Sequence, residues 1–243
     1  MSNPEVDIVI PTRDRGPLVD VTIDSILHSG YRDFRLWIVD QSEGGATEAA
    51  VAPHCRADDR VRYVRSHSAG SNLARDEGVS AGRAPYILFT DADCRVEPGW
   101  VGAMASELSH QEHSAVFGRV IPEEDFEAHR KAGAREVSPS IRLAVKDHPQ
   151  RQEFVGNRFR LDFGHGANMG LRRDAYRAIG GFDLLLGCGG PLRAWPERDI
   201  GYRILSRGGR IIYTPEAVVH HRHWRDWTEV RRTVRVRTEQ VVS

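Results

Sequence analysis

The stretch ILFTDADCRVEPGW, from Ile87 to Trp100, places two aspartates directly after a short apolar run. Such a run is typical of a buried strand, and ligands of an open α/β sheet gather at the carboxyl ends of its strands. If the backbone stays extended, Asp91 and Asp93 point to the same side, because side chains alternate along a strand. Two carboxylates repel each other unless a cation lies between them, and Mg²⁺ or Mn²⁺ suits carboxylate and phosphate oxygens. An Asx turn that caps the next helix would give the same pattern without a metal.

The residues before this stretch alternate between short apolar runs and helical patterns. The apolar runs, each of which predicts a strand, are VDIVIP (6–11), FRLWIVD (34–40), VRYVRS (61–66) and YILFT (86–90). Segments with apolar residues at helical spacing separate them, and two of these segments end at glycine. This βαβα order predicts an α/β, Rossmann-like fold with a mostly parallel central sheet that helices cover on both faces.

The second half of the chain has a less regular pattern. Further strands are predicted at AVFGRVIP (115–122), RIIYTP (210–215) and AVVHH (217–221), and GHGANMGL (164–171) looks extended. Helices are predicted at RRDAYRAIGGF (172–182) and PERDIGYRILSRGG (196–209), which carry proline and glycine where helix ends favour them. Residues 123–163 are polar and rich in arginine, and they give no firm prediction. The last twenty residues form a basic helical pattern without a cap, which indicates a frayed or truncated helix.

The composition excludes several classes of protein. The 243 residues include 34 acidic and 34 basic side chains, so no net charge draws the chain to nucleic acid. Three separated cysteines without a CxxC pair argue against a structural zinc site or a disulfide framework, and they fit a reducing compartment. The first residues do not resemble a signal peptide, and no apolar run reaches the roughly 18 residues of a membrane span. We therefore expect a cytoplasmic protein.

Six blocks of the sequence, taken in order, carry a resemblance to a known family. VDIVIPTRDR, WIVDQSEGG and SAGSNLARDEGVSAGRAPYILFTDADCRVEPGW resemble the nucleotide-sugar domain of the GT-A glycosyltransferases of family 2. GHGANMGLRRDAYRAIGGFD, ERDIGYRIL and PEAVVHH resemble the acceptor half of the same family. The resemblance implies a single GT-A domain over residues 1–243. Its nucleotide-sugar half would span 1–122, its acceptor and catalytic half 123–223, and a basic helical tail would follow at 224–243.

The resemblance also implies where a nucleoside-diphosphate sugar would bind. Asp40 matches the acid that contacts the base, although Gln41 stands where the family has a second acid. Arg75 matches an Arg-Asn pair of the family; Asp76 replaces the Asn, and we expect it to form a salt bridge with Arg75. Asp91 is expected on the ribose and metal side, and Asp93 on the metal. The complete set expected to bind the donor is Pro11, Thr12, Arg13, Asp40, Arg75, Asp91, Ala92 and Asp93.

Three histidines follow the last predicted strand, in the order AVVHHRHW. The resemblance assigns one histidine of this block to the metal or to a phosphate. His221 is the first choice and His220 the second. Alternation would place His221 and His223 on one face and His220 on the other. The metal would be Mn²⁺ or Mg²⁺, and an imidazole ligand favours Mn²⁺.

The block WPERDIGYRIL would supply the catalytic base. An acceptor hydroxyl must lose its proton as it attacks, and the resemblance assigns this proton to Glu197, with Asp199 as the alternative. Acids in a first helical turn are also favoured by the helix dipole, whatever their function. On the acceptor side we expect Gly166, Asn168 and Trp195, whereas Trp100 is expected in the core. The glycine-rich loop 187–190 could close over the bound donor.

Together these features predict an inverting, metal-dependent glycosyltransferase with a carbohydrate or a lipid-linked acceptor. The tail at 224–243 has the charge to contact the anionic inner face of a cell membrane. A phosphohydrolase that uses Asp91 as nucleophile is disfavoured, because Cys94 and Arg95 stand where that motif needs a hydroxyl. A dinucleotide oxidoreductase would need a GxGxxG after the first strand, and PTRDRG is not one. The remaining alternative is a catalytically idle module that binds a nucleotide sugar within a larger complex.

Overall fold

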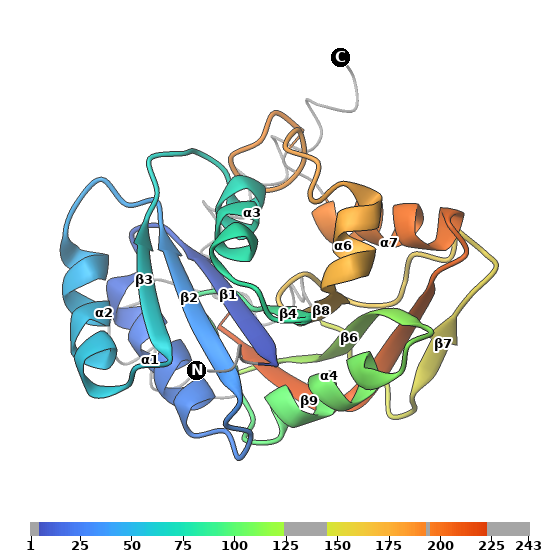
Figure 1. The fold of residues 1–243 in the computed structure, drawn as a ribbon, viewed down its shortest axis with the longest axis horizontal. Coiled ribbons are helices and arrows are strands. Elements are labelled where there is room, and N and C mark those ends of the chain that lie inside the picture. Colours follow the sequence, from blue (N-terminus) through green and yellow to red (C-terminus); the bar gives the residue numbers. More distant parts are fainter. Residues whose placement is uncertain (1–4, 124–144, 193–194, 223–243) are drawn as a thin grey trace.

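The structure, a computed structural model, describes residues 5–123, 145–192 and 195–222 (Figure 1). Its first half has the predicted alternation of strands and helices. The elements are β1 (Val6–Thr12), α1 (Gly16–Leu27), β2 (Phe34–Asp40), α2 (Ala46–Ala57), β3 (Val61–Arg65), α3 (Ser71–Ala81) and β4 (Tyr86–Phe89).

The second half departs from the sequence prediction at three points. The elements are β5 (Cys94–Val96), α4 (Trp100–Ser109), β6 (His113–Pro122), β7 (Gln152–Phe154), β8 (Met169–Arg172), α6 (Arg173–Ile179), α7 (Pro196–Ser206) and β9 (Arg210–His221). The segments predicted as two short strands at 210–215 and 217–221 form the single strand β9. The extended segment predicted at 164–171 is a strand only from Met169 onward. A short strand, β5, follows the two aspartates directly. The predicted basic helix at 224–243 lies outside the described residues.

One sheet connects both halves of the chain, in the order β3-β2-β1-β4-β8-β6-β9-β5, with β7 also paired to β9. Strands β1 to β4 are parallel neighbours, which confirms the predicted parallel arrangement. Strand β8 is antiparallel to both β4 and β6, and β9 runs parallel to β6. The carboxyl ends of β1, β2 and β4 therefore meet at one edge, where the polar site residues gather.

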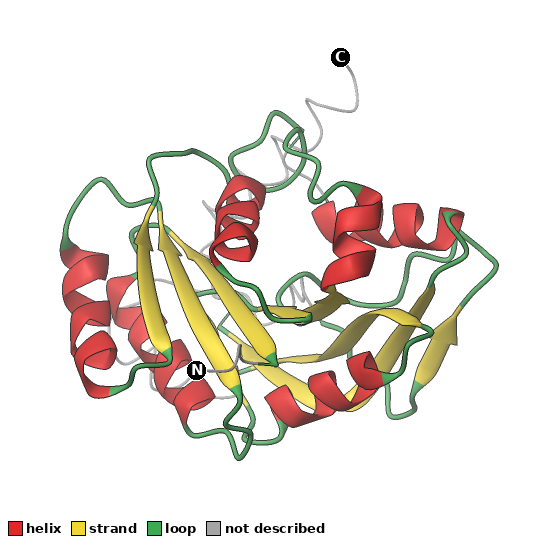
Figure 2. Ribbon diagram, viewed as in Figure 1, coloured by secondary structure: helices red, strands yellow, loops and turns green. Residues whose placement is uncertain are grey.

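Helices cover both faces of the sheet (Figure 2). One apolar cluster packs α1 and α4 against Ile8 and Ile10 of β1, and a second packs α3, α6 and α7 against Val9. Neighbouring residues of β1 therefore belong to opposite layers, as strand alternation requires. Ile8, Val9 and Ile10 have no exposed surface, and burying one such side chain stabilises the fold by about 1.5–3 kcal/mol.

A buried ion pair ties the first strand to the second half of the chain. Arg173, at the start of α6, donates to the Asp7 carboxylate at 2.7 Å, and Trp37 donates its indole N–H to the same carboxylate at 2.8 Å. The Ala84 amide donates the third hydrogen bond at 2.8 Å. Because these donors compensate the buried charge, the carboxylate can be buried at an acceptable cost.

Candidate active site

The two aspartates lie in a turn rather than on an extended strand. The Cys94 amide donates to the Asp91 carbonyl at 3.2 Å, so the chain reverses at Ala92 and Asp93 before β5 begins. The buried Thr22 hydroxyl of α1 fixes this turn, at 2.6 Å from the Cys94 carbonyl and 3.0 Å from the Ala92 carbonyl. The condition for both carboxylates to point the same way, an extended backbone, is therefore not met, and the two carboxylates have different partners.

Asp91 is bound by an arginine of α3. The Arg75 guanidinium donates to Asp91 at 2.9 Å and to the Asn72 side chain at 3.3 Å. The predicted salt bridge between Arg75 and Asp76 is wrong, because consecutive helical residues do not face each other. Asp76 instead accepts from the Tyr176 hydroxyl and from the Phe182 amide.

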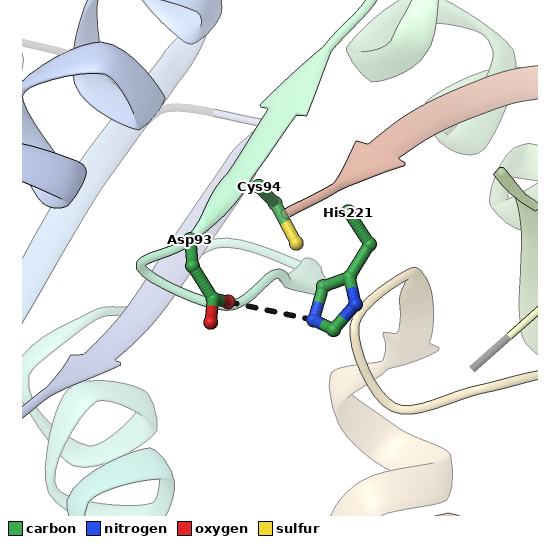
Figure 3. A group of neighbouring side chains, drawn as sticks. All are labelled: Asp93, Cys94 and His221. Atoms are coloured by element: carbon green, nitrogen blue, oxygen red, sulfur yellow. Dashed lines mark ion pairs between the residues drawn. The ribbon is translucent and has the colours of Figure 1, made fainter. Parts of the chain in front are cut away.

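Asp93 lies between a histidine and an arginine. Its Oδ1 is 3.4 Å from His221 Nε2 (Figure 3). Its Oδ2 is 3.4 Å from an Arg15 nitrogen. The Arg222 amide donates to the Asp93 carbonyl at 2.9 Å, which joins the end of β9 to the turn. His221 is only 5% exposed and Asp93 is partly buried, so the two ligand candidates lie near each other at the boundary of the protein interior.

The strand register separates the two neighbouring histidines. In the antiparallel pair of β5 and β9, Cys94 lies opposite His221 and Arg95 lies opposite His220. His220 therefore projects from the other face, where its Nε2 is 3.1 Å from the Glu97 carboxylate. The structure contradicts His220 as a metal ligand for this reason, and His223 lies outside the described residues.

A metal ion would fit the residues that remain. A carboxylate oxygen of Asp93, the Cys94 sulfur and a ring nitrogen of His221 lie within 4.8 Å of one another. Carboxylate and imidazole ligands suit Mn²⁺, and Mg²⁺ prefers the carboxylate. Asp91 is outside this group, since Arg75 holds its carboxylate elsewhere.

The expected donor loop follows β1. The Thr12 hydroxyl is buried and has no hydrogen-bond partner within the described part of the chain, as expected of a group that awaits a ligand. Pro11 is half-buried beside it. Arg13 is exposed, and its nearest charges are Asp14 at 3.8 Å and Glu43 at 4.0 Å, so its guanidinium is accessible to a phosphate.

The acid expected to contact the base does not reach the surface. Asp40 is fully buried and accepts hydrogen bonds from the Ser42 amide at 2.9 Å and from the Tyr63 hydroxyl at 2.8 Å. This contradicts direct contact with a base and makes Asp40 a support for the loop. The half-buried Gln41 donates its amide nitrogen to Ser68 at 2.9 Å, which turns its carbonyl oxygen the other way. The sequence could have indicated Gln41 as a site residue, because it occupies the position where the family has a second acid.

The two acids of α7 have different surroundings. Asp199 accepts from Arg203 Nε at 2.9 Å, and the same guanidinium donates to the Ile179 and Gly181 carbonyls that end α6. Glu197 is 8% exposed and points toward the Gly166 backbone, where an added Cβ would lie 3.6 Å from its Oε2. Asp199 thus holds α6 to α7, while Glu197 faces the predicted acceptor segment.

His165, which was not predicted from the sequence as a site residue, lies near Glu197, Asp91 and His221. The His165 and His221 ring centroids are 6.0 Å apart. Desolvation lowers the pKa of His165, and the carboxylates of Glu197 and Asp91 act in the opposite direction. The Ala167 amide donates to His165 Nδ1 at 3.1 Å, so the neutral ring carries its proton on Nε2. The sequence feature that could have indicated His165 as a site residue was its position inside the GHGANMGL block.

The predicted acceptor residues differ in burial. Asn168 is fully buried; its amide donates to the Arg119 and Ala217 carbonyls, and its oxygen accepts from Trp100. Contact between Asn168 and an acceptor is therefore contradicted, while Trp100 is confirmed as a core residue. Trp195 is 52% exposed beside α7, with the Arg198 guanidinium 5.0 Å from its ring centroid, so a contact with a sugar there stays a prediction.

The glycine-rich loop is attached to the start of α3. The Asn72 side chain donates to the Asp183 carbonyl at 2.8 Å and to the Leu186 carbonyl at 3.0 Å. The Ser71 amide donates to the Cys188 carbonyl at 2.8 Å. Closure of this loop over a donor stays a prediction, and these three bonds are the ones that such a motion would change.

This fold, with acids after the fourth strand and on α7, is that of a GT-A glycosyltransferase. Residues 7–180 match the family described as Glycosyl transferase family 2, and the chain belongs to this family. The structure resembles a mannosyltransferase, PcManGT from Pyrobaculum calidifontis in complex with GDP-Man and Mn²⁺. The TM-score is 0.69 at 16% identity, covering 97% of this chain and 61% of that one. It also resembles residues 1–349 of S. aureus TarS in complex with UDP-GlcNAc, with a TM-score of 0.66 at 11% identity, covering 88% and 57%.

Two curated relatives match nearly the whole chain. One is the pre-mycofactocin glycosyltransferase of Mycobacterium tuberculosis, 26% identical over 231 residues, which are 93% of this chain and 45% of the relative. The other is the glucosyl-dolichyl phosphate glucuronosyltransferase of Haloferax volcanii, 24% identical over 93% of this chain and 71% of the relative. The chain thus spans less than half the length of the mycobacterial relative. Within the described residues, no helix is both long and apolar enough to cross a membrane.

Proposed function

We propose that this chain transfers a sugar from a nucleoside-diphosphate sugar to an acceptor hydroxyl, with inversion at the anomeric carbon and Glu197 as the base. The observation that carries the proposal is the gathering of charges around His165. Glu197 lies beside the backbone of Gly166, the residue after His165, and the His165 and His221 ring centroids are 6.0 Å apart. His221 Nε2 is in turn 3.4 Å from Asp93, so these contacts bring the acid of α7 near the acidic turn after β4. This arrangement suits a donor diphosphate on the side of the acidic turn after β4 and an acceptor on the side of Glu197.

On the donor side, each residue has a task that its position supports. Asp93 and His221 would hold Mn²⁺ or Mg²⁺, which when bound offsets the charge of a departing diphosphate. Arg15, now 3.4 Å from Asp93, would exchange this contact for a phosphate oxygen, since a guanidinium suits either anion. The Thr12 hydroxyl would gain the partner that it lacks, and the Gln41 carbonyl oxygen would accept from a base N–H.

On the acceptor side, Glu197 would accept the proton of the attacking hydroxyl. A largely buried carboxylate suits this role because few waters compete for it, and general bases typically contribute about 10²–10⁴-fold to a rate. Acceptors that are carbohydrates or lipid-linked sugars both fit the family. The Haloferax relative, named for a dolichyl phosphate, supports including lipid-linked sugars among those tested.

The test is a turnover assay with a panel of nucleoside-diphosphate sugars, in Mn²⁺, in Mg²⁺ and in a chelator. We expect free nucleoside diphosphate to appear only with a metal, and NMR of the transferred sugar to show the opposite anomeric configuration to the donor. Retained configuration would overturn the inverting mechanism. Calorimetric binding of a donor without any release would instead identify a catalytically idle binding module.

A further inference from the structure

Cys94 lies beside the two residues expected to hold the metal. It is the first residue of β5 and is paired directly opposite His221 of β9, so the two side chains project from the same face of the sheet (Figure 3). Asp93 precedes it in the turn. The sulfur, an Asp93 oxygen and a His221 nitrogen lie within 4.8 Å of one another, and three different elements of backbone hold them there.

The spacing of these atoms suits a tetrahedral ion. Two oxygen or nitrogen ligands, each roughly 2.0–2.1 Å from one Zn²⁺, lie about 3.3 Å apart at the tetrahedral angle. Asp93 Oδ1 and His221 Nε2 are 3.4 Å apart. A sulfur at about 2.3 Å from the same ion would lie about 3.6 Å from each of them, and the Cys94 sulfur lies within 4.8 Å of the other two ligand atoms.

The chemistry of a thiol separates this site from one made of oxygen and nitrogen alone. Thiolate ligands favour Zn²⁺ and similar soft ions, whereas Mn²⁺ and Mg²⁺ prefer oxygen. Cys94 is 2% exposed, so its thiol lies in the same enclosed position as the other two ligand candidates. When an ion binds, the S–H bond breaks, a sulfur–metal bond forms and the proton leaves to solvent.

We propose that Asp93, Cys94 and His221 bind a thiophilic divalent cation such as Zn²⁺, and that this ion excludes the hard ion used in sugar transfer. The exclusion rests on the proposed function, whereas the binding does not. Three protein ligands leave a tetrahedral ion one open position, too few for both phosphates of a donor. An octahedral Mn²⁺ held by Asp93 and His221 keeps enough positions for both.

The test uses Cd²⁺ as a spectroscopic probe and the variant C55S/C188S, in which Cys94 is the remaining thiol of the chain. Cd²⁺ is added to the metal-free protein while the near-ultraviolet sulfur-to-cadmium absorption and the released protons are followed, and Zn²⁺ is then added as competitor. In the same background, Cys94→Ser removes the sulfur, His221→Ala removes the imidazole, and His220→Ala is the matched control on the opposite face. Cys94→Ala replaces Cys94→Ser if the serine variant does not keep its far-ultraviolet circular dichroism.

We expect one equivalent of Cd²⁺ to produce the absorption band, and Zn²⁺ to abolish it. The band should be lost with Cys94→Ser, weakened at least about tenfold in affinity by His221→Ala, and little changed by His220→Ala. No band in the parent protein, or equal affinity in the two histidine variants, overturns the proposal. Mn²⁺-dependent release of nucleoside diphosphate by the parent, measured without Cd²⁺, separates the outcomes. Release without a band refutes only the thiophilic site, and a band without release refutes only the proposed function.

Discussion

The turn after β4 and the first turn of α7 each carry two acids separated by one residue. In each region an arginine binds one acid: Arg75 donates to Asp91 at 2.9 Å, and Arg203 donates to Asp199 at 2.9 Å. The other acid of each pair has different neighbours: Asp93 lies 3.4 Å from His221, and Glu197 lies against the Gly166 backbone beside His165.

The difference between the two members of each pair lies in their partners, since their residue types and spacing are alike. An arginine that also bonds backbone carbonyls, as Arg203 does, fixes its acid as part of the packing between helices. The partners of Asp93 are His221 and the exposed Arg15, whose contact a ligand can replace without opening a packing contact between helices. The contacts therefore divide four similar acids into two that build the site and two that would act in it.

The largest difference is expected within α7. Glu197→Gln should keep donor binding and lower turnover by about 10²–10⁴-fold, because the amide cannot accept the acceptor proton. Asp199→Asn should change turnover much less and instead lower the unfolding temperature, since it weakens the contact between α6 and α7. Steady-state kinetics, donor calorimetry and thermal unfolding of both variants provide the measurements. Equal loss of turnover in the two would remove the distinction between these acids.

A smaller difference is expected within the turn after β4. Asp93→Asn should weaken Mn²⁺-dependent binding of a nucleoside diphosphate by at least about tenfold, since it removes a charged ligand candidate. Asp91→Asn should weaken it less, because its first consequence is the release of Arg75. Isothermal calorimetry with and without Mn²⁺ measures both changes. A stronger effect at Asp91 than at Asp93 would show that the metal lies on the other side of the turn.

The smallest effect is expected at Asp76, which has a tyrosine partner in place of an arginine. Burial raises the pKa of Asp76, and the hydrogen bond from Tyr176 opposes this. The folded state therefore holds its proton to higher pH than the unfolded chain, and stability is lost as the pH rises through the folded pKa. Asp76→Asn keeps an acceptor for Tyr176 and removes the charge. Its unfolding temperature should exceed the parent's by a few degrees at neutral pH, and the gain should vanish near the ordinary aspartate pKa of about 3.9. A gain that persists in acid would exclude this cause.

Much of the fold followed from local patterns. The apolar runs of β1, β2 and β4 are buried on both faces, and only a parallel sheet covered by helices satisfies them. Strand β5 and the continuity of β9 were missed because β5 has three residues and Pro215 interrupts the apolar pattern of β9. Neither feature is visible until the two strands pair with each other.

The sequence by itself determined the order of the elements apart from the short strands β5 and β7, the family, and the presence of acids at the end of β4 and the start of α7. These depend on residue type and spacing, which the chain carries locally. The tertiary structure decided which partners each acid of the two pairs has, that His221 and not His220 faces Asp93, and that Asp40 and Asn168 are bonded inside the protein. The reason is physical: strand register and helix packing bring together residues far apart in the chain, 128 positions for Asp93 and His221 and 166 for Asp7 and Arg173, and no short-range pattern encodes those contacts.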